Sequence, residues 1–464
     1  MLFSSNYFLF TFLPVVLIVY FIAPKRFRNF ILFIASIFFY SWGEPVYVFL
    51  MLFSAVFNYS MALDINKEQD NGNTGKGTLI FTVVINLFIL CFFKYYGFFM
   101  DTVNDILHTD IKYTALALPI GISFYTFQAL SYIFDVYRNN VTVQKSLLKF
   151  SLYLSLFPQL IAGPIVKYKD VALQLDDREV TPEKFGKGVH RFIIGLGKKV
   201  ILANNFGLLY TTITSSGSDS VTVLTYWIGI IAYTLQIYFD FSGYSDMAIG
   251  LGHMFGFDFM ENFNYPYISK SVTEFWRRWH ISLSTWFKEY VYIPLGGNRV
   301  KVSRHILNLL IVWSLTGLWH GASWNFIVWG LYYGVLLIIE KYFIGRYVEK
   351  APSFVRHCYA LVIVMVGWVF FSSPDLGAAL EYLKVMFFAG HVPFANIKTF
   401  YFFRTNSLLL IAGVIMSTPW PYRYFTKYYQ EHKITGTLII LALFILCVAY
   451  LIFSSYNPFL YFRF

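Results

Sequence analysis

The chain has 464 residues, of which 57% are hydrophobic, 21% aromatic and only 13% charged. Soluble domains average roughly 45–50% apolar and 25% charged residues, so the composition excludes an ordinary soluble protein and indicates an integral membrane protein. The net charge of +11 would suggest nucleic-acid binding in a soluble protein. Here lysines and arginines held in cytoplasmic loops explain the charge, and we expect no nucleic-acid partner.

Apolar segments near the ~20 residues needed to cross a bilayer recur along the whole chain. They lie at about residues 3–23, 29–42, 46–63, 78–100, 114–137, 147–165, 188–212, 222–250, 303–319, 323–343, 355–371, 376–390, 406–420 and 435–455. Some are too short or too polar for a simple crossing. We therefore predict an all-α, polytopic membrane protein with about ten to twelve transmembrane helices plus re-entrant segments.

Basic residues set the expected topology. Lys25 and Arg26 follow the first span and place the N-terminus outside, because cytoplasmic loops are enriched in lysine and arginine. Residues 166–199 are rich in lysine and are predicted to be the main cytoplasmic loop. Lys427 and Lys433 precede the last apolar run, so the C-terminus is expected outside as well. The predicted location is the cytoplasmic (inner) membrane.

No linker long enough to separate domains interrupts the chain. We predict a single membrane domain over residues 1–464, with a core at 1–345, C-terminal helices at 346–456 and an aromatic tail at 457–464. Polar and glycine-rich interruptions of the apolar pattern concentrate in the middle of the chain, as in LPIGISFYTFQALSYIFDVYR and QIYFDFSGYSDMAIGLG. Broken hydrophobic segments of this kind are typical of a site within a membrane fold.

Metal and nucleotide motifs are absent from the sequence. Its three cysteines, Cys91, Cys358 and Cys447, form no CxxC pair, which indicates neither a disulfide framework nor a metal site. The GLGKK string lacks the spacing of a phosphate-binding loop, and no HEXXH zinc motif is present. We therefore expect no bound metal.

His320 is the first candidate for a site. It is the only ionisable residue in LTGLWHGASWNFIVWG, and ionisable groups at bilayer depth are costly and usually functional. A neutral imidazole can take a proton from a hydroxyl that attacks an acyl carbonyl. The alternative is a histidine that donates one hydrogen bond across a helix interface.

A second candidate set lies about forty residues upstream in WRRWHISLSTW. Arg277 and Arg278 could bind the phosphates of an anionic donor, or they could belong to a juxtamembrane helix whose cations meet lipid headgroups. His280 is expected to support the site. Trp276 and His280, one turn apart, would share a helix face.

Two carboxylates, Asp240 and Asp246, lie in the aromatic run QIYFDFSGYSDMAIG. Buried carboxylates need partners, so we expect them to pair with arginine or hydroxyl groups and to fix a re-entrant turn. Their six-residue spacing around a glycine is weak support for a pair of catalytic acids. Scaffolding is the favoured role.

The chain ends in the aromatic string NPFLYFRF. An apolar tail after an outward-going span is either loose or inserted into the protein. From Asn457 to Tyr461 an extended chain covers roughly 17 Å at ~3.4 Å per residue, about half of the ~30 Å hydrocarbon core. Tyr461 is thus predicted to reach the depth of His320 from outside.

Taken together, these strings resemble the membrane-bound O-acyltransferase (MBOAT) family, in particular its bacterial branch that O-acetylates alginate and peptidoglycan. The resemblance runs from MLFSSNYFLF through LPIGISFYTFQALSYIFDVYR, FPQLIAGPI and YFDFSGYSDMAIGLG to ENFNYPYISKSVTEFWRRWHISLSTWFKEYVYIPLGGNR and GLWHGASWNFIVWG. It implies the MBOAT fold with a central tunnel, His320 as the catalytic histidine and His280 as a second histidine needed for activity. Trp319 and Asn325 flank His320 and are expected to support it.

The resemblance also implies substrates and partners. The donor would be acetyl-CoA or a similar thioester, with no bound cofactor, and the acceptor an exported polysaccharide of the alginate, peptidoglycan or cellulose type. A periplasmic or extracellular SGNH-hydrolase-like acetyltransferase would be the partner. NPFLYFRF is similar to the aromatic C-terminus of a small partner in teichoic-acid D-alanylation, which makes Tyr461 a candidate acyl relay.

Two other classes of function are compatible with a polytopic chain. In a transporter or flippase of an envelope precursor, the buried charges would line a substrate path. Inverted repeats would favour this class, and the sequence shows no convincing internal repeat. A scaffold for an export complex is the other class, and it would leave the buried His320 without a role.

Overall fold

The computed structural model describes residues 1–114, 116–161, 163–217, 221–387, 392–453, 456–458 and 460. Within these ranges all regular secondary structure is helical, which confirms the predicted all-α class. The chain forms two compact units, residues 1–192 with 247–260 and residues 193–246 with 261–464. The prediction of one membrane domain stays a prediction.

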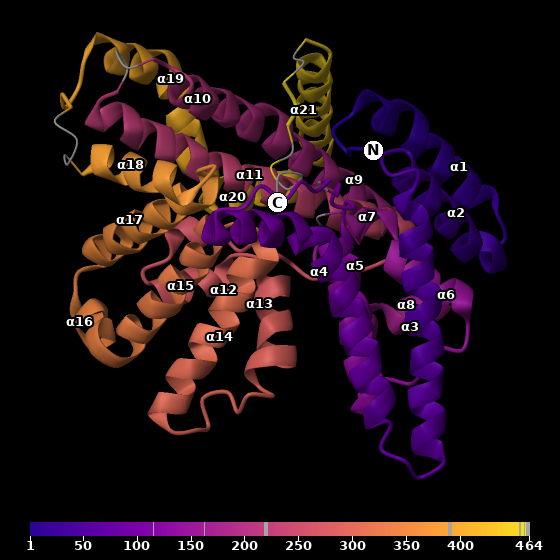
Figure 1. Ribbon diagram of the computed structural model, residues 1–464. Helices are drawn as coiled ribbons and strands as arrows, with labels where there is room; N and C mark the ends of the chain where they lie inside the picture. Colours follow the sequence, from indigo (N-terminus) through magenta and orange to yellow (C-terminus); the bar gives the residue numbers. More distant parts are fainter. Residues whose placement is uncertain are drawn as a thin grey trace. The chain divides into compact units, whose positions relative to one another are not determined.

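The first unit is built from the N-terminal helices (Figure 1). These are η1 (Phe8–Phe12), α1 (Leu13–Ile22), η2 (Lys25–Phe27), α2 (Arg28–Ser41), α3 (Tyr47–Asp70), α4 (Lys76–Leu107), α5 (Ile122–Tyr137), α6 (Leu147–Ser155), α7 (Phe157–Leu160), α8 (Tyr168–Asp176), most of α9 (Pro182–Gly197) and the end of α11 (Val223–Phe255). The long helix α5 packs against both α3 and α4.

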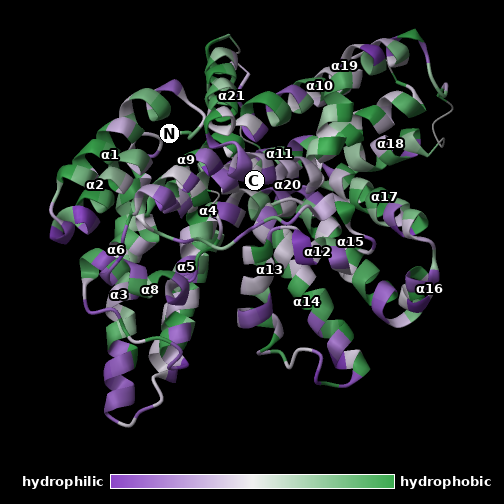
Figure 2. Ribbon diagram, turned by 180° about the vertical axis from the view of Figure 1, so that it is seen from behind, coloured by the Kyte–Doolittle hydropathy of each residue, from purple (hydrophilic) through white to green (hydrophobic). Residues whose placement is uncertain are grey.

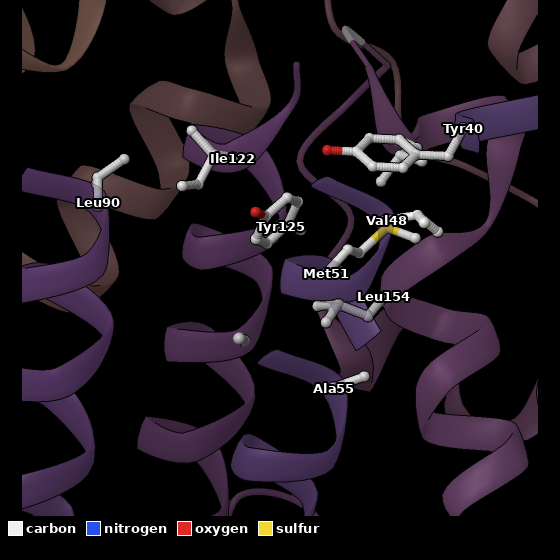
Figure 3. Close-up of a cluster of buried hydrophobic side chains, with 10 residues drawn as sticks. Tyr40, Val48, Met51, Ala55, Leu90, Ile122, Tyr125 and Leu154 are labelled. Atoms are coloured by element: carbon white, nitrogen blue, oxygen red, sulfur yellow. The ribbon is translucent and has the colours of Figure 1, made fainter. Parts of the chain in front are cut away.

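A buried apolar cluster holds this unit together (Figure 3). Tyr40 of α2, Met51 of α3 and Tyr125 of α5 are almost completely buried in it. The Tyr40 hydroxyl donates a hydrogen bond to the Ile120 carbonyl at 2.9 Å, so its polar end is satisfied just before α5 begins. The cluster fixes the packing of α2, α3 and α5.

The second unit contains the remaining helices. They are η3 (Lys198–Ala203), α10 (Asn204–Thr214), most of α11, η5 (Pro266–Ile268), α12 (Val272–Arg278), α13 (Ile281–Phe287), η6 (Lys288–Tyr292), α14 (Val302–His320), α15 (Trp324–Ile339), η7 (Glu340–Ile344), α16 (Gly345–Lys350), α17 (Ser353–Ser372), α18 (Leu376–Met386), α19 (Ile397–Met416), α20 (Trp420–Glu431) and α21 (Lys433–Phe453).

Seven helices in the described part of the chain are long and apolar enough to cross a membrane. They are Tyr47–Asp70, Lys76–Leu107, Pro182–Thr214, Trp324–Lys350, Ser353–Ser372, Ile397–Met416 and Lys433–Phe453. Most side chains of α19 and α21 are exposed although largely apolar, and Figure 2 shows α21 as largely hydrophobic. Contact with lipid accounts for such surfaces, so the chain is a multi-pass membrane protein.

Two interpretations of the sequence are wrong. Residues 182–199, predicted to belong to a loop, are helical and lie in the segment Pro182–Thr214, whereas the cytoplasmic side of residues 166–199 stays a prediction. The run around Gly243, assigned to a re-entrant turn, lies inside the uninterrupted helix α11. A Cβ atom at Gly243 would lie 2.8 Å from the Gly195 carbonyl oxygen. The glycine therefore permits close helix packing instead of a turn.

A second glycine contact sets the geometry around His320. Helix α14 packs along α15, and a Cβ atom at Gly317 would lie 2.4 Å from the Phe326 carbonyl oxygen. A Cβ atom at Gly330 would lie 2.3 Å from the Trp313 carbonyl oxygen. Neither position accepts a side chain without separating the two backbones. The close crossing fixes the C-terminal end of α14, where His320 lies.

We predict that Gly317→Ala destabilises the protein by about 1–3 kcal/mol, because the added methyl group overpacks the α14–α15 contact. The matched control is Gly186→Ala in α9, where nothing lies within 4 Å of the new Cβ atom. That variant should be neutral or gain up to about 1 kcal/mol from helix propensity. Thermal unfolding in detergent measures both, and equal midpoints for the two variants would contradict the prediction.

Candidate functional site

His320 is enclosed by aromatic rings at the end of α14. Its imidazole is 6% exposed. The ring centroid lies 5.0 Å from that of Trp319, 4.9 Å from that of Trp329 and 5.3 Å from that of Phe371, each in an edge-on arrangement. Aromatic contacts of this geometry hold a ring in one orientation. The imidazole is therefore shielded from bulk solvent and positioned by packing.

The end of α14 is shaped by Gly321. The backbone of this residue is extended, and a Cβ atom there would lie 2.1 Å from the ring of Phe326, so only glycine fits between His320 and α15. Helix α14 ends at His320, immediately before this extended glycine. The unpaired carbonyls at the C-terminal end of a helix carry partial negative charge, which favours a proton arriving on the imidazole.

A second histidine, His280, lies in the same aromatic cluster. Its side chain is 2% exposed, and its ring centroid lies 6.1 Å from that of Trp319. The rings of Phe263 and Phe241 lie 6.2 and 6.5 Å away. Trp319 thus contacts both imidazoles. Burial favours the neutral form of an imidazole, which can accept a hydrogen bond.

The local fold of His280 depends on where α12 ends. The helix stops at Arg278, Trp279 is extended, and His280 has a positive φ of 44° at the start of α13. Histidine is among the residues that adopt this left-handed conformation more readily. The expectation that Trp276 and His280 share a helix face is wrong, because the helix ends between them.

Hydrogen bonds hold both sides of this bend. At the start of α12, the Glu340 carboxylate accepts the backbone N–H groups of Val272 and Thr273, both at 2.8 Å. Beyond the bend, the Asn262 carbonyl accepts the Ile281 N–H at 2.9 Å. The bend is thus anchored at both ends, which fixes His280 next to Trp319.

The arginines lie apart from these rings. The guanidinium group of Arg278 pairs with Glu274 at 3.0 Å and donates to the Asn264 carbonyl at 3.1 Å. Both partners belong to α12 or its adjoining loop, so Arg278 braces this segment. Arg277 is exposed, which leaves it accessible to an anionic donor or to lipid headgroups.

Asn325 anchors the beginning of α15. Its side chain is 1% exposed, and its amide donates to the carbonyls of Phe370 and Ser373 at 3.1 and 3.0 Å. These carbonyls lie at the C-terminal end of α17, next to the Phe371 ring that contacts His320. Asn325 therefore acts on the site indirectly, by fixing α17 against α15.

Asp240 and Asp246 pair with two consecutive lysines. Asp240 lies 2.6 Å from the Nζ of Lys199, and Asp246 lies 2.6 Å from the Nζ of Lys198. The sequence pattern predicted arginine or hydroxyl partners for the two carboxylates, and it predicted that both lysines lie in a loop. The sequence signal for these pairs was GLGKK, which places two lysines between two apolar runs. Two cations in such a position need buried carboxylate partners. Lys199 and Asp240 are 2% and 1% exposed.

The C-terminal tail contacts this ion pair. The backbone N–H of Leu460 donates to Asp240 Oδ2 at 2.9 Å, and Lys199 Nζ donates to the Pro458 carbonyl. Leu460 itself is buried. Tyr461, the candidate relay, lies outside the described residues. The next residue after Asp240 in α11 is Phe241, whose ring contacts His280.

Comparison with known proteins decides the family. The model of MBOAT, the membrane-bound O-acyltransferase family, matches residues 37–376. The chain belongs to this family. A probable alginate O-acetylase, AlgI, of Azotobacter vinelandii is 44% identical over 397 residues, which cover 84% of this chain and 79% of the relative.

Two further relatives extend the comparison. A probable alginate O-acetylase AlgI of Pseudomonas putida is 37% identical over 490 aligned residues and covers both chains completely. A peptidoglycan O-acetyltransferase of Helicobacter pylori is 37% identical over 424 residues, covering 83% of this chain and 80% of the relative. The resemblance to the MBOAT family is confirmed, and this MBOAT protein is an O-acyltransferase.

We predict that His280→Gly unfolds at a higher temperature than His280→Ala. Both variants lose the ring, but only glycine adopts a positive φ without strain, which corresponds to about 1–2 kcal/mol. Thermal unfolding in detergent measures the difference, and acyl transfer is assayed in parallel. Equally low transfer in the two variants assigns the activity to the ring, whereas recovery of transfer in His280→Gly would assign it to the backbone bend.

Proposed function

We propose that this MBOAT protein transfers an acetyl or similar short acyl group from a cytoplasmic thioester, such as acetyl-CoA, for O-acetylation of an exported cell-envelope polysaccharide. The observation that carries the proposal is the buried pair of imidazoles, His320 and His280, each in contact with the ring of Trp319. The names of the relatives support an acceptor of the alginate or peptidoglycan type.

His320 acts as the general base in this reaction. A neutral imidazole removes the proton from the attacking hydroxyl while the oxygen forms a bond to the acyl carbon. The positive charge that develops lies at the C-terminal end of α14, where it is favourable. The surrounding aromatic rings exclude water, which protects the thioester from hydrolysis.

Tyr461 serves as an acyl relay between donor and acceptor. Its hydroxyl oxygen attacks the thioester carbonyl as His320 takes the proton. The carbon–sulfur bond breaks, and the leaving thiolate receives that proton. The product is a phenyl ester. Because a phenol has a pKa of about 10 and water one of about 15.7, the phenolate then leaves readily when a serine or sugar hydroxyl attacks.

The relay requires that the donor and the final acceptor lie on opposite sides of the membrane. The donor is cytoplasmic and the polysaccharide lies outside, so the acyl group must cross a hydrocarbon core of about 30 Å. We place the protein in the cytoplasmic membrane with both termini outside, and we place a tunnel at the histidines. A periplasmic or extracellular SGNH-hydrolase-like acetyltransferase accepts the acyl group and passes it to the polysaccharide.

Labelling with radioactive acetyl-CoA tests the base and the relay together. We expect label on the C-terminal peptide of the purified wild-type protein. His320→Ala should lower the rate of labelling by about 10²–10⁴-fold, the usual contribution of a positioned base. Tyr461→Phe should abolish labelling and acetylation of the polymer, because the attacking oxygen is missing.

The matched control is His305→Ala, which removes the other buried histidine of α14. His305 hydrogen-bonds Tyr292 and Tyr342 at 2.7 and 2.6 Å and lies about 22 Å from His320 along the helix axis. This variant should still be labelled. Labelling that survives His320→Ala would refute the base assignment, and normal polymer acetylation in Tyr461→Phe would refute the relay.

Cysteine accessibility tests the topology. A cysteine placed at Ser353, the first residue of α17, and one appended to the C-terminus are each treated, in intact cells, with a membrane-impermeant thiol reagent. The C-terminal cysteine should react without permeabilisation, because the relay enters from outside. Reaction of the C-terminal cysteine only after permeabilisation would place the tail on the cytoplasmic side and contradict the proposed route.

A further inference from the structure

The C-terminal tail is held by three polar residues that no catalytic role explains. Lys199 of η3 and Asp240 of α11 contact the main chain at Pro458 and Leu460. Asn204, at the start of α10, donates from its Nδ2 to Asn457 Oδ1 at 3.2 Å. We call Lys199, Asn204 and Asp240 the tail clamp.

The ion pair of the tail clamp is energetically costly to bury. Lys199 and Asp240 are 2% and 1% exposed, and Lys199 belongs to an apolar helical segment long enough to cross the membrane. Buried ion pairs stabilise a protein poorly, because desolvation offsets their attraction unless further hydrogen bonds complete them. The tail supplies such bonds, a carbonyl to the ammonium group and an N–H to the carboxylate.

The backbone conformation at Lys199 is also typical of a functional site. Lys199 lies in a π-helical turn within the longer helix, and such turns often occur at functional sites. The close approach of α9 and α11 at Gly243 brings the backbone at Lys199 to 3.1 Å from where a Cβ atom of that glycine would lie. Lys199 and Asp240 are thereby presented from two adjacent helices.

Gly207 of α10 makes room for the tail next to Tyr456. A Cβ atom at Gly207 of α10 would lie 3.1 Å from the Tyr456 hydroxyl and 2.5 Å from the side-chain amide nitrogen of Gln236. Tyr456 therefore packs where only glycine leaves space. The tail contacts α10 at Gly207, the α10 start at Asn204 and α11 at Asp240, which is a continuous docking surface.

The tail clamp reads main-chain atoms in one register. Lys199 donates to the carbonyl of Pro458 and Asp240 accepts the N–H of Leu460, and the lysine and the carboxylate are joined to each other at 2.6 Å. The two contacts need a carbonyl and an N–H at this spacing and in these directions, so a shift of the tail by one residue would break both. The tail clamp thus selects a single register.

We propose that the tail clamp is a docking site that fixes the register of the C-terminal tail, so that residue 461 is presented toward the histidine pair. The role in presentation rests on the acyl relay proposed above. Lys199, Asn204 and Asp240 are positioning residues, and they take no part in the chemistry. The path from the clamp to the site is short, because Phe241, which follows Asp240, contacts His280.

Docking is measured by cross-linking, independently of activity. Cysteines replace Asn204 and Asn457 in a full-length protein whose Cys91, Cys358 and Cys447 have been changed to Ala. A thiol-oxidising reagent is applied in membranes, and mass spectrometry quantifies the linked peptides. This pair retains the Lys199 and Asp240 contacts, so we expect efficient cross-linking.

Leu460→Pro tests the main-chain contact without touching the ion pair. Proline removes the N–H that Asp240 accepts, and loss of a hydrogen bond to a charged group should lower the docked-to-undocked ratio roughly tenfold or more. The matched control is Leu460→Ile, which keeps the N–H and an apolar side chain of the same size. Equal cross-linking in the two variants would overturn the proposal.

The charge swap Lys199→Asp with Asp240→Lys separates docking from simple ion pairing. The swapped pair can still form, but its carboxylate cannot donate to Pro458 and its lysine cannot accept from Leu460. Starting from the same cysteine pair, we expect a folded protein by size-exclusion chromatography with cross-linking reduced as in Leu460→Pro. Wild-type cross-linking in the swap would show that the ion pair alone suffices and would overturn the proposal.

Activity distinguishes the clamp from the relay. If both proposals hold, labelling of the tail falls in Leu460→Pro in proportion to cross-linking and persists in Leu460→Ile. If Tyr461→Phe acetylates polymer normally while cross-linking still depends on the Leu460 N–H, the relay fails and the docking site stands. If labelling is undiminished in Leu460→Pro although cross-linking is lost, the role in presentation is refuted.

Discussion

A polar group inside a bilayer has no water to bind, so it must find its partner within the protein. This constraint governs much of the structure. The amides of Asn58 and Asn86 bind each other between α3 and α4, and Lys199 pairs with Asp240. In each case the partners come from different helices. Polar pairing therefore specifies which helices are neighbours, a task that apolar packing against lipid-like surfaces performs poorly.

The histidine site meets the same constraint in a different way. His320 and His280 are surrounded chiefly by aromatic rings instead of charges. A neutral imidazole is far less costly to bury than an ion. Such a ring can form hydrogen bonds without placing a permanent charge among these side chains. Lys199 and Asp240 form an ion pair that contacts the main chain of the C-terminal tail. The proposed reaction transfers no proton to or from them.

The sequence predicted the helical class and singled out both histidines, because each of these features is visible locally. A continuous apolar run indicates a span, and an ionisable residue among tryptophans indicates an unusual site. The lysines at 198 and 199 were misassigned because their partners lie more than forty residues away in α11. The positive-inside rule counts charges along the chain and does not register that a buried carboxylate neutralises them.

A glycine was the other source of error. Gly243, which was predicted to form a re-entrant turn, and Gly321 both lie close to a candidate site residue in the sequence. One lies inside a helix at a close crossing, and the other ends a helix against the ring of Phe326. Only the neighbouring helix distinguishes these cases. The left-handed backbone of His280 was similarly hidden, because WRRWHISLSTW favours a continuous helix by composition.

The contacts of the tail clamp with Pro458 and Leu460 are made by main-chain atoms. The identity of the side chains at these two positions is therefore only weakly constrained. The number of residues between them and the end of α21 is constrained more strongly. An insertion or deletion of one residue in this connection would bring different main-chain groups to Lys199 and Asp240. The length of the connection, more than its composition, decides which residues the tail clamp holds.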